Sequence, residues 1–139
     1  MLHRTKKEHD ENRDKWIGIG GKINEGETPE QCLLREVKEE TGLTLTSYKY
    51  RGVVHFSSDI YDEEDMHLYT ADGFYGEITE CDEGSLEWID IDRLFDLTLW
   101  EGDKIFLSLI KTDVSFFDLG LFYKGEKLIS AFINNQKIF

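Results

Sequence analysis

The sequence predicts an α+β protein in which helices pack on a mixed β-sheet. Apolar residues make up 40% of the 139-residue chain and charged residues 32%, which is typical of a globular domain. Helical and strand patterns follow one another without the regular alternation of a βαβ protein, so an all-parallel sheet is not expected. The length suits one domain, and we expect residues 1–139 to form it.

The first elements are short. MLHRTKK has the pattern of the end of a strand, EHDENRD is a polar loop, and KWIGIGG is a brief apolar run broken by glycines. A helix is then predicted over TPEQCLLREVKEETG, where Thr28 and Gln31 form a capping box and Pro29 suits the first helical position. Gly42 is placed to end this helix in the left-handed conformation. Its core-facing side is expected to contain Leu33, Leu34, Val37 and Thr41.

The rest of the chain supplies most of the expected sheet. SYKYRGVVHFSS and MHLYTADGFYGEI predict strands joined by the acidic turn DIYDEED. LEWIDIDRLFDL predicts a short strand entering a helical turn, and GDKIFLSLIKTD has helical periodicity. FFDLGLFYKGEKLISAFI predicts a hairpin around Lys124–Gly125.

The charge of the chain limits its partners. A net charge of −13 and a pI of about 4.6 argue against binding to a nucleic acid polymer, although a small polyphosphate can bind through divalent cations. No run approaches 18 apolar residues and no signal peptide opens the chain, so we expect no membrane partner and a cytoplasmic location. Cys32 and Cys81 lack metal or C-x-x-C spacing and are expected to be free thiols, with Cys32 packed.

Three glutamates of the predicted helix, Glu36, Glu39 and Glu40, share one face. Like charges at this spacing repel by roughly 0.2–0.5 kcal/mol a pair. A divalent cation would relieve the repulsion, because Mg²⁺ prefers carboxylate and phosphate oxygens. Taken alone, however, a run such as REVKEE is more often a solvated helix face.

The residues around these glutamates resemble the Nudix box. From Gly21 to Leu43 the chain reads G-x5-E-x7-R-E-U-x-E-E-x-G-U, where U is a bulky aliphatic residue, and all nine fixed positions of this 23-residue pattern match. The chain is therefore similar to the Nudix hydrolase family. That resemblance implies an α/β/α sandwich with a catalytic loop-helix-loop at 21–43. It also implies hydrolysis, with Mg²⁺ or Mn²⁺ as cofactor, of a nucleoside diphosphate linked to a further group.

The resemblance also implies roles for single residues. Glu27 and Arg35 would form an ion pair that braces the loop against the helix. Gly20 and Gly21 would let the backbone approach phosphates, and Lys22 would either face a phosphate or remain in solvent. The metal would be held by four glutamates, one of which would also be the general base: Glu36, Glu39, Glu40 and Glu83.

The resemblance extends outside the box to bacterial 8-oxo-dGTP diphosphatases of the MutT/MutX kind. It is carried by two segments, MLHRTKK…KWIGIGGK and CDEGSLEWIDIDRLFDLTLWEGDKIFLSLI. By this resemblance Trp100 would line a purine pocket and Asp103 would hydrogen-bond the base edge, roles that suit an aromatic face and a carboxyl group. The alternatives are a core tryptophan and a helix N-cap. Ile17 departs from relatives that carry asparagine there, which puts base recognition in doubt.

The resemblance ranks the substrates. An oxidised purine nucleotide such as 8-oxo-dGTP comes first, ADP-ribose or a nucleotide sugar second, and a non-catalytic nucleotide-sensing module third. Relatives also carry a strand before MLHR, so we expect the N-terminal strand to be truncated. A second copy in a homodimer, or the C-terminal segment KLISAFINNQKIF, would then cover the open edge.

Overall fold

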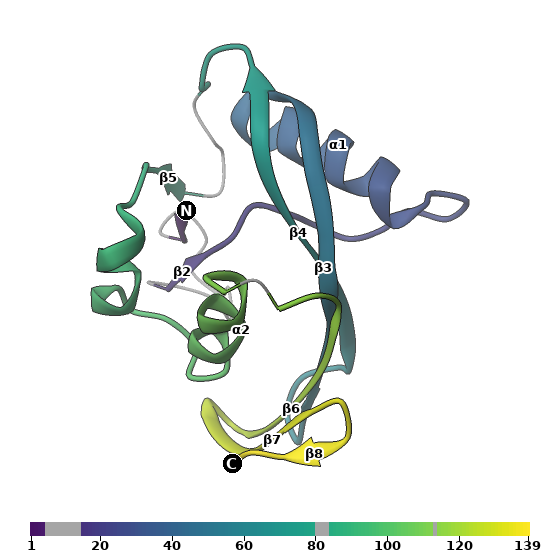
Figure 1. Ribbon diagram of the computed structural model, residues 1–139, viewed down its shortest axis with the longest axis vertical. Helices are drawn as coiled ribbons and strands as arrows, with labels where there is room; N and C mark the ends of the chain where they lie inside the picture. Colours follow the sequence, from purple (N-terminus) through teal and green to yellow (C-terminus); the bar gives the residue numbers. More distant parts are fainter. Residues whose placement is uncertain (5–14, 80–83, 113) are drawn as a thin grey trace. The chain divides into compact units, whose positions relative to one another are not determined.

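A computed structural model describes residues 1–4, 15–79, 84–112 and 114–139. The chain divides into two compact units, one made of Met1–Ser47 and Ala71–Leu99 and the other of Tyr48–Thr70 and Trp100–Phe139. Figure 1 traces the elements of both along the chain. Strands β3 (Thr44–Ser58) and β4 (Glu64–Tyr75) contribute residues to each unit.

The first unit contains a three-stranded sheet of order β2-β1-β5. Strand β1 (Leu2–Arg4) is central and pairs antiparallel with β2 (Trp16–Ile17) and β5 (Gly84–Leu86). A short 3-10 helix, η1 (Ile91–Asp96), follows β5. Strand β1 is therefore paired along both of its sides.

Helix α1 (Pro29–Thr41), also in the first unit, forms where its end signals place it. Both bonds of the capping box are present, at 2.9 and 3.1 Å, and Gly42 ends the helix with a φ of 82°. The expected buried side is partly wrong, because Leu34 is 36% exposed and Cys32 is buried in its place. Leu34 lies one turn from both Glu30 and Lys38, which are exposed, so it belongs to the solvent side.

The second unit is built on a mixed sheet, whose strand order over the whole chain is β4-β3-β6-β7-β8. Strand β6 (Phe117–Lys124) runs parallel to β3, with Gly52 opposite Phe117 and Ser58 opposite Tyr123. It pairs antiparallel with β7 (Lys127–Ile133), as the predicted hairpin requires, and β8 (Gln136–Lys137) follows. The C-terminal segment therefore pairs with β6 and with itself. The expectation that it covers an edge at the start of the chain is wrong for the described residues, and the homodimer remains a prediction.

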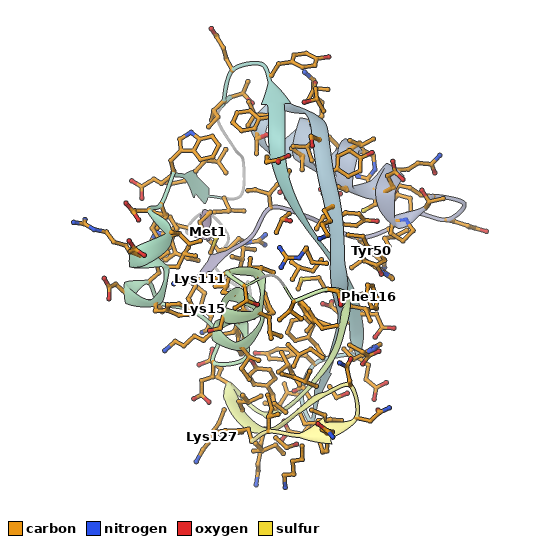
Figure 2. The ribbon with its side chains drawn as sticks, in the orientation of Figure 1. Met1, Lys15, Tyr50, Lys111, Phe116 and Lys127 are labelled. Carbon is orange, nitrogen blue, oxygen red and sulfur yellow. The ribbon has the colours of Figure 1, made fainter. Side chains whose placement is uncertain are left out.

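Alternating burial along β6 defines the core of the second unit. Every second residue from Phe117 to Tyr123 is buried, and helix α2 (Asp103–Ile110) contributes Phe106 and Leu107 to the buried set. Other aromatic residues stay exposed, such as Tyr50 and Phe116, whose rings meet edge-on at 5.1 Å (Figure 2). Neither α-helix in the described part of the chain is long and apolar enough to span a membrane.

The buried cation Arg51 holds the end of α2. Its guanidinium donates hydrogen bonds to the carbonyl oxygens of Ile110, Thr112 and Val114, at 3.3, 2.9 and 3.5 Å. It also donates to the hydroxyl of Thr70. The last carbonyls of a helix have no partner within the helix, so Arg51 supplies a donor for Ile110 and for two carbonyls of the segment that follows the helix.

Candidate active site

The loop before α1 is closed onto the helix by one ion pair. Arg35 Nε and Nη2 donate to the two carboxylate oxygens of Glu27, at 2.8 and 2.9 Å. The same carboxylate accepts the Asn24 N–H at 3.0 Å, and Arg35 Nη2 also donates to the Lys22 carbonyl oxygen at 2.9 Å. The predicted brace between loop and helix is thus present as a bidentate pair.

Arg35 also neutralises part of the glutamate cluster. Its Nη1 contacts Glu36 Oε1 at 2.6 Å and Glu39 Oε2 at 3.2 Å. Hydrogen bonding from Arg35, with a further bond from the Asn24 backbone, lowers the pKa of Glu27 to about 2. The hydrogen bonds that Arg35 donates to Glu27 and Glu36 raise the pKa of Arg35. The helix therefore tolerates its crowded carboxylates partly because a guanidinium sits among them.

Two of the three clustered glutamates of α1 contact the glycine pair. Glu40 Oε2 accepts the Gly20 N–H at 3.2 Å. A Cβ added to Gly21 would collide with the Glu36 carboxylate, so that carboxylate could keep its present position only beside a glycine. Glu39 differs, because its side chain is 60% exposed and bonds only Arg35 among the contacts described.

Oxygen donors on one side of α1, against a backbone without side chains, suit a hard divalent cation. The arrangement is not yet a coordination shell, since within the described ranges no three His, Cys, Asp or Glu side chains converge on one point. Glu36 would have to exchange Arg35 for the cation. Glu83, the fourth expected ligand, lies outside the described residues, as does Cys81.

The structure shows the positions of Lys22 and Ile17 but no contact that defines a function for either. Lys22 is exposed, and its backbone carbonyl rather than its ammonium group makes the contact with Arg35. Its contact with phosphate stays a prediction. Ile17 lies in β2 opposite Leu2 and is half-buried. Cys32 is buried, as expected.

Trp100 and Asp103 lie in the second unit, at the start of α2. Trp100 is half-buried and meets Tyr61 and Tyr123 edge-on, with ring centroids 6.4 and 5.5 Å away. Asp103 is 8% exposed and is the first residue of α2, because Gly102 is the N-cap. The reading of Asp103 as an N-cap is therefore wrong. The chain turns here because the Asp103 N–H donates to the Trp100 carbonyl at 3.0 Å.

Sequence reasoning missed Tyr123, which contacts this segment twice. Its ring meets Trp100, and its hydroxyl accepts the Gly102 N–H at 2.7 Å in a buried bond. The available signal was the alternation along β6, which puts Tyr123 on the same side as Phe117 and Leu119. That pattern predicts that Tyr123 is buried, but it does not indicate which residue its hydroxyl bonds.

Comparison with known proteins agrees with the motif. The NUDIX domain model matches residues 1–110. An oxidized purine nucleoside triphosphate hydrolase of Danio rerio is 37% identical over 118 residues, which cover 83% of this chain and 74% of that one. The protein of the same name from Mus musculus is 34% identical over 97 residues, covering 69% of this chain and 62% of its own.

A solved structure supports the fold. A MutT protein from Bacillus halodurans superposes with a TM-score of 0.85, covering 97% of this chain and 88% of that one, at 24% sequence identity. This match confirms the expected α+β class with a mixed sheet, and the family model and the relatives extend the agreement from fold to family. The chain belongs to the Nudix family and is a Nudix hydrolase.

Proposed function

We propose that this protein hydrolyses an oxidised purine nucleoside triphosphate, such as 8-oxo-dGTP, to the monophosphate and pyrophosphate. The observation that carries the proposal is the loop–helix arrangement in which Glu36 and Glu40 face Gly20 and Gly21. The names of the two vertebrate relatives support the substrate class. We treat residues 1–139 as one such domain, located in the cytoplasm.

A divalent cation, Mg²⁺ or Mn²⁺, is part of the proposal. Glu36, Glu39 and Glu40 would hold it, and Glu83 would add a ligand or serve as the base. When bound, the cation would polarise a phosphoryl oxygen and lower the pKa of a bound water. The fit rests on glycine backbone against carboxylates, where a side chain at position 21 would fill the space.

The residues of the chain would share the remaining tasks. Arg35, held by Glu27, keeps the glycine loop against the helix and balances the carboxylates when no cation is present. Lys22 would offset phosphate charge. Trp100 would stack on the purine, and Asp103 would accept N–H groups from the base edge.

One observation keeps a second substrate class in view. Ile17 offers no hydrogen bond to a base, so recognition of an oxidised purine would depend on Asp103 and backbone groups. ADP-ribose or a nucleotide sugar, for which that contact matters less, is therefore the alternative.

A panel of nucleotides separates the two. The release of pyrophosphate or monophosphate is measured with Mg²⁺ and again with Mn²⁺. The substrates are 8-oxo-dGTP, dGTP, dCTP, ADP-ribose and a nucleotide sugar. We expect the highest kcat/KM for 8-oxo-dGTP. A higher kcat/KM for ADP-ribose would favour the alternative substrate class. If no substrate is hydrolysed with either metal, the proposed activity is wrong and a non-catalytic, nucleotide-sensing role is favoured.

A further inference from the structure

The start of α2 is held from outside the helix. Its N-cap, Gly102, has no side chain to bond the first N–H groups, and no side-chain cap is present. Instead the Gly102 N–H donates to the hydroxyl of Tyr123, 21 residues later on β6, at 2.7 Å. Tyr123 is 7% exposed, so this bond is shielded from water.

The same tyrosine also fixes the ring before the helix. Its ring meets the Trp100 ring edge-on, at 5.5 Å and an interplanar angle of 81°. One side chain therefore contacts Trp100 through its ring and Gly102 through its hydroxyl. Asp103 is the next residue, and its N–H bonds the Trp100 carbonyl. Tyr123 therefore contacts the short segment that carries both expected base-contacting residues.

There is little freedom in this arrangement. A Cβ at Gly102 would lie 2.5 Å from the Tyr123 hydroxyl oxygen and 2.6 Å from Leu121 Cδ1. The residue before Gly102 is attached to the next strand, because Glu101 Oε2 accepts the Leu128 N–H of β7 at 3.2 Å. Residues 100–103 are therefore attached to both strands of the β6–β7 hairpin.

The hydroxyl is a stable acceptor. Burial, with the charges of Asp103 and Glu101 adding to it, raises the pKa of Tyr123, although the Gly102 hydrogen bond acts in the opposite direction. The hydroxyl is therefore neutral around neutral pH. A neutral hydroxyl can accept from the backbone without placing a second negative charge beside Asp103.

We propose that Tyr123 is a positioning residue for purine recognition, whose bond to the Gly102 N–H sets Trp100 and Asp103 in the geometry that the base requires. The inference rests on the proposed function, in which those two residues contact the base. Tyr123 itself need not contact the substrate. It acts through the segment that it holds.

The test is Tyr123→Phe, which keeps the ring and removes the hydroxyl. We expect KM for 8-oxo-dGTP to rise about threefold to tenfold, as for one lost buried hydrogen bond, with kcat changed less than about twofold. KM for dCTP should not change. Gly102→Ala, which crowds the hydroxyl from the other partner, should give the same split.

Two controls separate positioning from loss of structure. Tyr75→Phe removes a hydroxyl from a 63% exposed tyrosine of the first unit and should leave all constants unchanged. Arg51→Met loosens the opposite end of α2, and should lower Tm without changing the ratio of the two KM values. If Arg51→Met raises the purine KM as Tyr123→Phe does, general loosening of α2 explains the effect and the proposal is wrong.

Different results would overturn the proposed function and the positioning role of Tyr123. A wild-type enzyme that does not hydrolyse purine triphosphates would overturn the proposed function and this inference together. A wild-type enzyme that hydrolyses them, with Tyr123→Phe showing an unchanged purine KM, would overturn the positioning role alone.

Discussion

The two helices begin in opposite ways. At the start of α1, the capping groups are close in sequence, since Thr28 and Gln31 are three residues apart, and Glu27 bonds Arg35 across eight. At α2, the N-cap has no side chain, and its N–H depends on Tyr123, 21 residues away. The first helix start is fixed by local sequence, and the second by the sheet beneath it.

The difference suits the tasks that we propose. Carboxylates that are to hold a cation must keep their spacing when the cation leaves, and the α1 motif carries its own counter-charge in Arg35. The residues that we propose to select a base are instead held by a strand that lies far along the chain. Variants should therefore separate kcat effects at α1 from KM effects at α2.

The largest effect is expected for Glu40→Gln, which removes a charged ligand without changing volume. We expect kcat to fall more than tenfold, a barrier increase above roughly 1.4 kcal/mol, with the fold intact by circular dichroism. The amide oxygen can still accept the Gly20 N–H, so the loop should hold. Retention of more than a tenth of kcat would remove Glu40 from the metal set. Metal-free protein should even melt slightly higher, because one like-charge contact with Glu36 is gone.

Arg51→Met should destabilise the second unit most. The change removes the charged donor of the carbonyl oxygens of Ile110, Thr112 and Val114, and a hydrogen bond to a charged group contributes about 1.5–3 kcal/mol. We expect about 3 kcal/mol less free energy of unfolding in urea. Lys111→Met, an exposed change on the same turn, is the control. A loss below about 1 kcal/mol would mean that these carbonyls find other partners.

Trp100→Ala should raise KM for purine nucleotides more than it lowers kcat. Stacking acts on ground and transition states alike, and one base–aromatic stack contributes about 1–3 kcal/mol. The expected rise in KM is therefore about tenfold, measured for 8-oxo-dGTP beside dCTP. If both nucleotides suffer equally, Trp100 is a core residue and base selection lies elsewhere.

The same contrast explains what the sequence could predict. The ends of α1 and the Glu27–Arg35 pair were predictable because the signals lie within one 23-residue motif. The bonds of Arg51 to the last residue of α2 and to the segment after it span 59 to 63 residues, and no local pattern specifies such partners. Leu34 was misplaced because periodicity locates a helix face only to within about one residue.

Thr28→Ala tests whether α1 is as self-contained as its contacts indicate. Loss of the capping hydroxyl should cost about 1 kcal/mol of unfolding free energy, because the Gln31 N–H loses its acceptor. Thr28→Ser keeps that acceptor and should restore most of the loss. A cost near zero would show that packing, and not the cap, fixes the start of α1.

The smallest effect concerns His55 in the second unit, which links three strands. Its Nε2 lies 3.1 Å from Asp118 on β6 and its Nδ1 lies 2.6 Å from Asp65 on β4, and these hydrogen bonds, Asp118 first, raise the pKa of His55. A raised folded pKa means that the added stability is fully present below the unfolded value of about 6.5 and is lost as pH rises through the folded value. The imidazole is 40% exposed, so solvent screening keeps the contribution below about 1 kcal/mol. Between pH 6 and pH 9, the free energy of unfolding measured in urea should decrease more for the wild type than for His55→Gln. Equal decreases would mean that the two aspartates do not stabilise the charged ring, and that the link between β4, β3 and β6 rests on backbone pairing alone.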